Sequence, residues 1–110
     1  MGTRSETQVS AERELRVHAQ IALLGAITPG LRAVSVELRE NTLGWRCVFE
    51  SEAAREAEWE ELSAAATEVI AHYPEVAESR DEFLVCSDLS LTEENARSLE
   101  FLVFRRFEGE

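Results

Sequence analysis

The residues best suited to nucleophilic chemistry are few in this chain of 110 residues. It contains two cysteines, Cys47 and Cys86, and two histidines, His18 and His72. Nucleophilic catalysis needs a base within hydrogen-bonding reach of the nucleophile, and no histidine lies near either cysteine in the sequence. The alternating pattern around Cys47 places its side chain in a buried strand, where a thiol packs as a small hydrophobe. We therefore expect neither cysteine to be catalytic.

The sequence also lacks the residue spacings that are typical of metal-binding sites and of acid–base catalytic pairs. His18 and His72 fall on different predicted helices, and no second histidine or cysteine follows either of them at three or four residues. The acidic stretch 88–95 lacks the ligand spacing of an EF-hand, and no Gly-x-Gly-x-x-Gly or Walker loop is present. With 22 acidic residues, some carboxylates come close by chance, and the sequence singles out no catalytic pair. We expect no enzymatic activity, no metal and no cofactor.

The charge balance is the most unusual property of the sequence. Twenty-two acidic residues against 11 basic ones give a net charge of −11. This excess disfavours binding to nucleic acids or anionic membranes and favours basic partners, although it also suits a surface that only keeps the protein dissolved. A small basic island could form from Arg39, Arg46, Arg105 and Arg106, but we favour strand-end charges that pair with nearby acids.

The cysteine usage and the ends of the sequence bear on the compartment. Two cysteines without a paired spacing suit a reducing compartment with both thiols free. No apolar run approaches the ~18 residues of a membrane span, and the first residues lack the apolar stretch of a signal peptide. We expect a cytoplasmic protein.

We expect residues 1–9 to be a flexible N-terminus and residues 10–110 to form a single domain. The first helix is predicted from an N-cap at Ser10 to about Ile27, before the breaker Thr28-Pro29-Gly30. It has two apolar stripes on nearly opposite sides, so either it is sandwiched within the domain or one stripe faces a partner. One stripe contains Leu15, Ala19, Ala22 and Ala26, and the other contains Val17, Ile21 and Leu24.

Two alternating runs around a short polar turn, residues 31–39 and 43–50, predict a β-hairpin. The second helix is expected to be capped by Ser51 and to run to about Tyr73, before Pro74. Its predicted buried stripe consists of Trp59, Leu62, Ala66, Val69, Ile70 and Tyr73.

The rest of the chain predicts two more strands. After a polar connection over residues 75–81, the third strand is expected over residues 83–87 and the last over residues 99–107. Because the last strand is apolar on both faces, we expect it inside the sheet or covered on its second face. The fold class is α+β: a two-layer sandwich in the order α-β-β-α-β-β, with helices packed on a four-stranded, mainly antiparallel sheet.

The face of the sheet away from the helices would then carry an apolar patch. Monomers rarely leave such a patch in water, so we expect a second copy or another protein to cover it. The alternative is that the first helix packs there. The residues placed on this face are Val48, Leu84, Cys86, Leu102 and Phe104, and the self-association candidates among them are Val48, Leu84, Leu102 and Phe104.

Two stretches resemble a group of short bacterial proteins. They are Ala19-Gln-Ile-Ala-Leu-Leu-Gly-Ala-Ile-Thr-Pro-Gly-Leu-Arg-Ala-Val-Ser-Val and Ala66-Thr-Glu-Val-Ile-Ala-His-Tyr-Pro. The resemblance covers residues 19–76, with a weaker match in the last strand. It is a resemblance to immunity proteins of contact-dependent inhibition and related toxin–immunity systems. Because the matching residues are core and turn positions, the resemblance carries over no binding residues.

Three hypotheses follow. The first is an immunity protein that neutralises a cognate toxin by direct binding; the toxin is expected to be basic and nuclease-like, since opposite charges speed encounter. The second is a homo-oligomeric structural or regulatory domain, such as a homodimer. The third is an enzyme or ligand-binding protein with a pocket lined by Trp45 and Tyr73. Candidate contacts for the first are Glu56, Glu60, Glu61, Glu68, Glu93 and Glu94.

Overall fold

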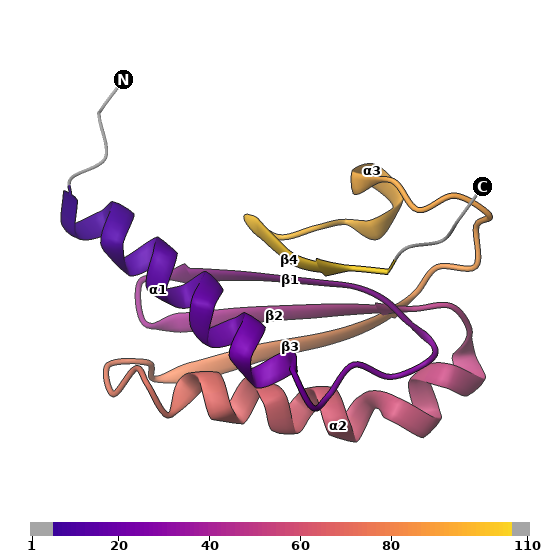
Figure 1. The fold of residues 1–110 in the computed structure, drawn as a ribbon, viewed down its shortest axis with the longest axis horizontal. Coiled ribbons are helices and arrows are strands. Elements are labelled where there is room, and N and C mark those ends of the chain that lie inside the picture. The colour runs from indigo at the N-terminus through magenta and orange to yellow at the C-terminus, as the bar shows by residue number, and fades with distance from the viewer. Residues whose placement is uncertain (1–5, 107–110) are drawn as a thin grey trace.

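The computed structural model describes residues 6–106, and this part of the chain contains a sheet with two long helices packed against it (Figure 1). In chain order the elements are α1 (Glu6–Leu23), β1 (Leu31–Arg39), β2 (Thr42–Phe49), α2 (Glu52–Ile70), β3 (Glu78–Val85), α3 (Glu93–Ala96) and β4 (Phe101–Arg105). The expected α+β class is confirmed. None of the helices in the described residues is long and apolar enough to cross a membrane.

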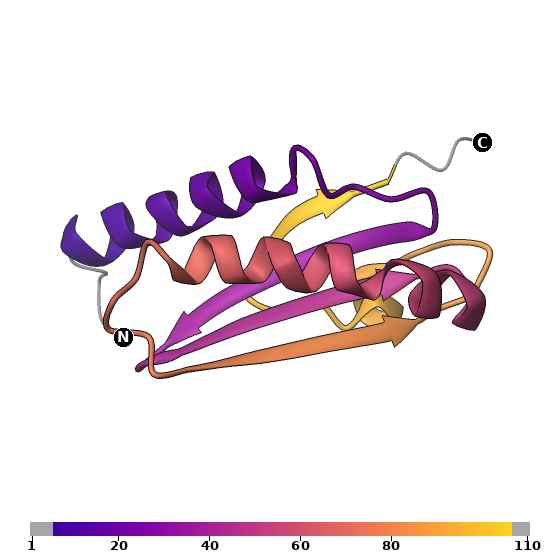
Figure 2. The ribbon, with the colours of Figure 1, turned by 90° about the horizontal axis from the view of Figure 1, so that it is seen from below.

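The four strands lie in the order β3-β2-β1-β4. Pairing is antiparallel between β1 and β2 and between β1 and β4, and parallel between β2 and β3. The sheet is therefore mixed and mainly antiparallel, as expected. The helix α2 connects the two parallel strands and lies over them, while α1 lies over β1 and β4 (Figure 2). Of the two alternatives for the last strand, the interior position is excluded, because β4 forms an edge.

The predicted hairpin is confirmed, with Val36 opposite Trp45 and Leu38 opposite Leu43. Alternate residues of both strands face the helices and form the main core with them. Trp45 and Phe49 are fully buried there. Gly30, just before β1, packs closely on α2, since a Cβ at this position would collide with the Cβ of Ala54.

The helix α2 begins where the sequence predicts. Ser51 adopts an extended conformation and its Oγ accepts a hydrogen bond from the Ala54 N–H at 3.1 Å, which satisfies one of the free amides of the first turn. Leu62 and Val69 are buried against the sheet. Trp59 was expected in the same stripe, but its side chain is 41% exposed at the margin of the helix.

The helix α1 lies further towards the N-terminus than expected. It begins at Glu6 rather than near Ser10 and ends at Leu23 rather than at Ile27. Residues 1–5, which belong to the segment expected to be flexible, lie outside the described residues, as does the side chain of Ser10. The first apolar stripe faces the core, with Leu15 and Ala19 buried.

The second apolar stripe of α1 is open to solvent. Val17 is 50% exposed, Ile21 58% and Leu24 83%. The helix is therefore not sandwiched within the described chain, because this stripe is half or more exposed.

The third strand is longer than the sequence indicated. It begins at Glu78 instead of Phe83, within the stretch expected to be a polar connection, and ends at Val85. The reason is its place at the edge of the sheet, where one side of the strand is exposed and polar residues are tolerated. Charged residues at its start thus concealed the strand.

The last strand is shorter than expected and contains a β-bulge. Phe104 lies opposite Val34, but Leu102 lies opposite Ser35, so Val103 is an extra residue in β4. The extra residue shifts the alternation by one, and Phe104 packs against the main core instead of pointing away from the helices. The expectation that Leu102 and Phe104 share a face is therefore wrong. Phe107, the expected end of this strand, lies outside the described residues.

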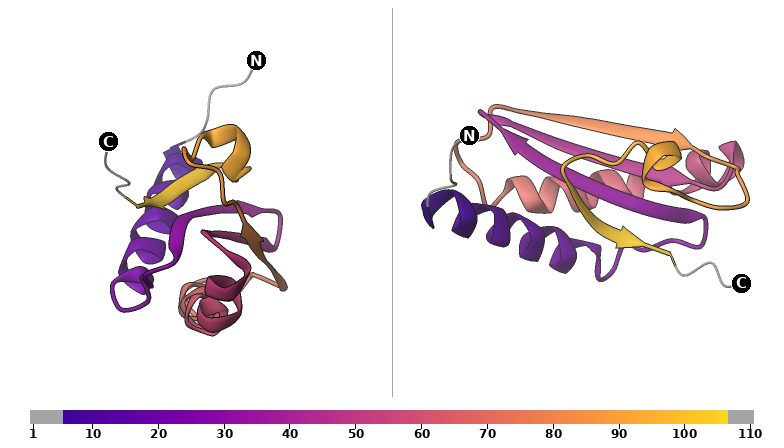
Figure 3. Two further views of the ribbon diagram at one scale, coloured as in Figure 1. Left: turned by 90° about the vertical axis from the view of Figure 1, so that its right-hand side faces the viewer. Right: turned by 90° about the horizontal axis from the view of Figure 1, so that it is seen from above.

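The second face of the sheet is covered largely by the chain itself. Leu91 and Ala96, from the segment around α3, pack on Ala33, Val48 and Cys86. This small cluster corrects the expectation that a second molecule must cover Val48, and also the alternative that α1 does so. Figure 3 shows α3 on the side of the sheet away from α2. The side chain of Thr92 accepts a hydrogen bond from the N–H of Asn95 at 3.1 Å and thereby caps α3.

Candidate partner-binding surface

The outer side of α2 is strongly acidic. The helix contains six glutamates and one arginine, and this arginine, Arg55, forms an ion pair with Glu52. Four of the glutamates were singled out from the sequence, and all of these are exposed: Glu56, Glu60, Glu61 and Glu68. With 3.6 residues per turn, Glu56 and Glu60 lie one turn apart on the flank nearer β3, and Glu61 and Glu68 two turns apart on the flank nearer α1.

One further glutamate of α2 has a structural role. The carboxylate of Glu58 accepts hydrogen bonds from the N–H of Gly30, at 3.1 Å to Oε1 and 3.2 Å to Oε2. This contact fastens the loop before β1 to the helix, so Glu58 is not part of the free acidic surface.

A groove lies between the acidic side of α2 and the edge strand β3. Its volume is about 340 Å³, and Arg55, Glu56, Trp59 and Phe83 line it. The rings of Trp59 and Phe83 meet edge to face, with centroids 5.8 Å apart. Partly exposed aromatic residues are enriched at protein interfaces, where they act as anchors within a polar rim.

The structure does not bring all six candidate acids together. Glu93 and Glu94 lie on α3, which packs on the opposite face of the sheet from α2 (Figure 3). Glu94 is exposed there, and the side chain of Glu93 lies outside the described residues. One flat interface cannot include both groups, so the α2 surface and the α3 surface are separate candidates.

The four candidate self-association residues are likewise dispersed. Val48 is buried beneath the segment around α3, and Leu84 is half-buried beside it. Phe104 packs against the main core. Leu102 is 41% exposed and is thus the one member of this set that remains open to a partner.

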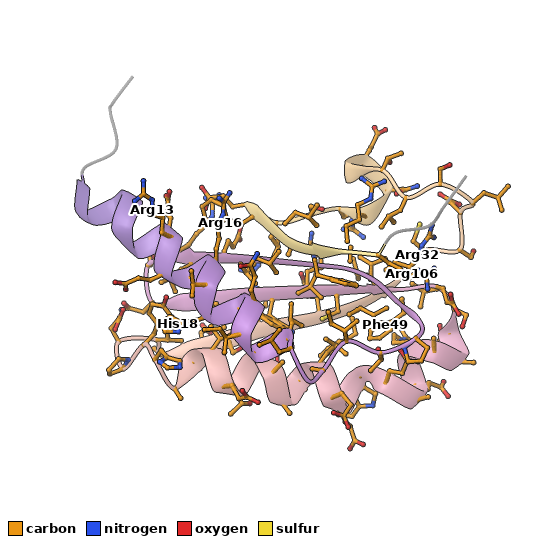
Figure 4. All side chains as sticks on the ribbon, viewed as in Figure 1. Arg13, Arg16, His18, Arg32, Phe49 and Arg106 are labelled. Atoms are coloured by element: carbon orange, nitrogen blue, oxygen red, sulfur yellow. The ribbon has the colours of Figure 1, made fainter. Side chains whose placement is uncertain are left out.

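The two histidines, expected on separate helices, stack on each other. The ring centroids of His18 and His72 are 3.9 Å apart, and Tyr73 meets His18 edge to face at 5.8 Å. The contact joins α1 to the end of α2; Figure 4 shows where His18 lies on α1. Among the described residues, no three His, Cys, Asp or Glu side chains are placed to hold a metal ion. The geometry fits packing between helices.

The cysteines are placed where thiols are inert. Cys47 and Cys86 are free and buried, the first in the main core and the second under α3. Burial, and then the charge of Asp81, raises the pKa of the Cys47 thiol above its ordinary value. A nucleophilic cysteine needs the opposite shift.

Sequence reasoning missed Arg32, a buried residue at a bulge in β1. The register passes from Leu31 opposite Phe49 to Ala33 opposite Val48, so Arg32 is the extra residue, and bulges re-aim side chains in this way. Its guanidinium donates to the carbonyl oxygens of Cys86 at 2.6 Å and Asp88 at 2.8 Å.

The structure agrees with the favoured reading of the four arginines: three of them pair with nearby acids, and the fourth donates to a backbone carbonyl. Arg39 pairs with Glu37 at 3.5 Å, and Arg46 donates to Glu82 at 2.8 Å. Arg105 donates to the carbonyl of Leu91. Arg106 lies beside Arg32 at the far end of the sheet (Figure 4) and donates to Glu50 at 2.9 Å.

Comparison with known proteins identifies a family. A family model described as MafI2 immunity protein matches residues 12–108. No curated protein matches the chain. Because the family match spans most of the sequence, the chain belongs to this family.

Proposed function

We propose that this chain, as a member of the MafI2 immunity protein family, neutralises a cognate toxin by binding it directly and without catalysis. The observation that carries the proposal, beyond the family itself, is the exposed acidic surface of α2, made of Glu56, Glu60, Glu61 and Glu68. We define these four residues as the α2 acidic surface. The negative charge of this surface is complementary to a basic protein, such as a toxin that acts on nucleic acid.

Electrostatics explains why such a surface suits an inhibitor. A basic toxin and a chain with a net charge of −11 attract each other before they touch, which raises the association rate by about 10- to 1,000-fold. An inhibitor must capture the toxin before the toxin reaches its substrate, so a fast association rate has direct value. The same charge excludes polyanions from the surface.

Calorimetric titration tests the proposal, with the protein encoded by the gene next to this one, called here the product of the adjacent gene, as the candidate toxin. We expect one-to-one binding that weakens about tenfold or more when the salt concentration rises from about 50 mM to about 500 mM. Replacing the four residues of the α2 acidic surface by glutamine should lower the affinity and flatten this dependence. The comparison is Glu94→Gln on the α3 surface, the other candidate, which should behave like the wild type because the proposal places the toxin on α2. Absence of binding by the wild-type chain would overturn the proposal, and binding that does not depend on salt would exclude the α2 acidic surface.

A second candidate function, self-association, is favoured by the exposed stripe of α1. Val17 and Ile21 lie one turn apart on α1, and Leu24 and Ile27 follow in the segment after the helix; each of the four is at least 49% exposed. A homodimer joined along this stripe would bury it and leave the α2 acidic surface free. Sedimentation at increasing concentration tests this arrangement: a dimer that Ile21→Glu converts to a monomer supports it, and a monomer at all concentrations excludes it.

A further inference from the structure

The outer edge of β3 is unpaired in the sheet. β3 is the terminal strand in the order β3-β2-β1-β4, and its only strand partner among the described residues is β2. In a parallel ladder, alternate residues direct their backbone groups to the same neighbour. The N–H of Cys86 donates to the carbonyl of Phe49 at 2.9 Å, and the register with β2 runs without a shift from Glu78 to Val85, so the even-numbered residues face β2. Before the strand, Ala77 and Glu78 share the carbonyl of Asn41, at 2.7 and 3.4 Å.

The odd-numbered residues of β3 therefore present their backbone groups outward: Ser79, Asp81, Phe83 and Val85. A side-chain contact agrees with this direction, since Arg55 donates to the carbonyl of Phe83 at 3.4 Å, a distance at the weak end of the hydrogen-bond range. Val85 is 37% exposed. Such an edge is a template for an incoming strand.

The side chains beside this edge define what strand would fit. On the face towards α2, an added strand would run along the groove formed by Trp59 and Phe83, whose centre is aromatic. Glu56 lines the groove, Glu60 is exposed one helical turn further along α2, and Asp81 lies on β3 itself. Arg55, the basic side chain that lines the groove, is paired with Glu52. An apolar side chain can pack on Trp59 while basic residues two positions away in the strand, which point to the same face, meet the acids.

We propose that the edge of β3 and the adjoining groove receive an extended segment of the toxin, which adds to the sheet as a fifth strand and carries basic residues around an apolar anchor. The inference rests on the proposed function, because the occupant is the toxin. Backbone hydrogen bonds to the outward groups of β3 would fix the register of the added strand. Trp59 and the acids would select the side chains that this strand carries. β3 carries three acids, Glu78, Asp81 and Glu82, against one base, Arg80, so pairing of this edge with a second copy of the chain would bring together more like than opposite charges.

The test compares Asp81→Pro with Asp81→Ala in titrations with the product of the adjacent gene. Both variants remove the carboxylate, but only proline removes the outward N–H, and it leaves the hydrogen bonds to β2 intact. We expect Asp81→Pro to bind about tenfold more weakly than Asp81→Ala, as the loss of one backbone hydrogen bond at an interface predicts. Trp59→Ala should weaken binding by about tenfold or more. Equal affinities of the two Asp81 variants would overturn the proposal.

Amide hydrogen exchange of the wild-type chain gives a reading that does not depend on how the proline variant folds. In the free chain, the amides of Ser79, Asp81, Phe83 and Val85 should exchange faster than those of Arg80 and Glu82. Bound toxin should slow the outward amides about tenfold or more. Tight binding that leaves them unprotected would overturn the edge proposal and leave the immunity function standing. Absence of any binding by the wild type would overturn both.

Discussion

Arg32 joins three segments that are far apart in the sequence. Its side chain reaches the carbonyls at the end of β3, and its own carbonyl accepts the N–H of Arg106 after β4. The residue is only 3% exposed, so the contacts between its charge and these carbonyls are made away from water. A buried charge without such partners would be costly, and the carbonyls would lose their donor if the guanidinium were removed.

Arg32→Ala should therefore lower the free energy of unfolding by about 2–3 kcal/mol, the scale of hydrogen bonds to a charged group. The measurement is urea unfolding at pH 7. Arg39→Ala is the matched control, because this arginine lies in the same strand but its side chain is 69% exposed. It should change the free energy by less than about 0.5 kcal/mol. Equal effects of both changes would show that the buried contacts contribute nothing specific.

Tyr73 gives the stability a pH dependence. Its hydroxyl is buried and forms no hydrogen bond within the described residues. Burial, and then the charges of Glu14 and Glu75, raises the pKa of Tyr73 above its ordinary value of 10.0. The folded state thus holds this proton more tightly than the unfolded state does. The stabilisation that this proton gives to the folded state is complete below pH 10, the ordinary pKa, and is lost as the pH rises through the folded-state pKa.

Tyr73→Phe should leave the free energy of unfolding unchanged or slightly higher at neutral pH, because it removes a buried hydroxyl without a partner. Above about pH 10 the stability of the variant should fall less steeply than that of the wild type. Urea unfolding at several alkaline pH values measures this difference. The raised pKa of the Cys47 thiol contributes the same decline to both proteins. Identical alkaline profiles would contradict the role assigned to Tyr73.

Among the elements, the segment around α3 has the most unexpected role. A four-residue helix in a polar loop covers the second face of the sheet by inserting Leu91 and Ala96 over Val48. Leu91 is 2% exposed, whereas Leu89, two residues earlier, is 99% exposed. Replacing each leucine in turn therefore distinguishes the effect of burial from the effect of the residue type.

Leu91→Ala should lower the free energy of unfolding by about 2–4 kcal/mol, since it removes buried methyl groups and leaves a cavity. Leu89→Ala should change it by less than about 0.5 kcal/mol. Chemical unfolding of both variants measures the difference. If Leu91→Ala were neutral, the segment around α3 would not be packed on the sheet as described.

The elements also show what sequence patterns can and cannot predict. The hairpin and the cap at Ser51 follow from local rules of alternation and capping, and the structure confirms both. The bulge at Val103 does not, because it arises from pairing with β1, and one extra residue moved Phe104 into the core. The start of β3 was missed because edge strands tolerate polar residues.

The candidate site, too, was predictable from the sequence only in part. Exposure of the glutamates in α2 was predictable from helical periodicity, because the buried stripe fixes which side faces solvent. The groove at Trp59 and Phe83 was not, since it depends on which strand lies beside α2. The contacts of Arg32 with residues more than 50 positions away have no local signal in the sequence.

At the scale of the whole molecule, the chain presents three different surfaces. The α2 acidic surface and the edge of β3 adjoin each other, the stripe on α1 is apolar, and α3 covers the sheet on the far side. In Figure 4, Arg13 and Arg16 lie on α1, and Arg16 stacks over the ring of Phe101, which holds this helix against β4. The acidic side chains of α2 and the apolar stripe belong to different helices, so we expect that one surface can bind a basic partner while the other remains free.

The most direct test of the immunity function is protection of cells. Bacteria that express the product of the adjacent gene are plated with the wild-type chain, with the variant whose α2 acidic surface is replaced by glutamine, or with no chain, at equal amounts of folded protein. We predict that the wild type restores viable counts to those of cells without the toxin, and that the variant protects less. Killing that continues at full strength in the presence of the folded wild-type chain would contradict the account.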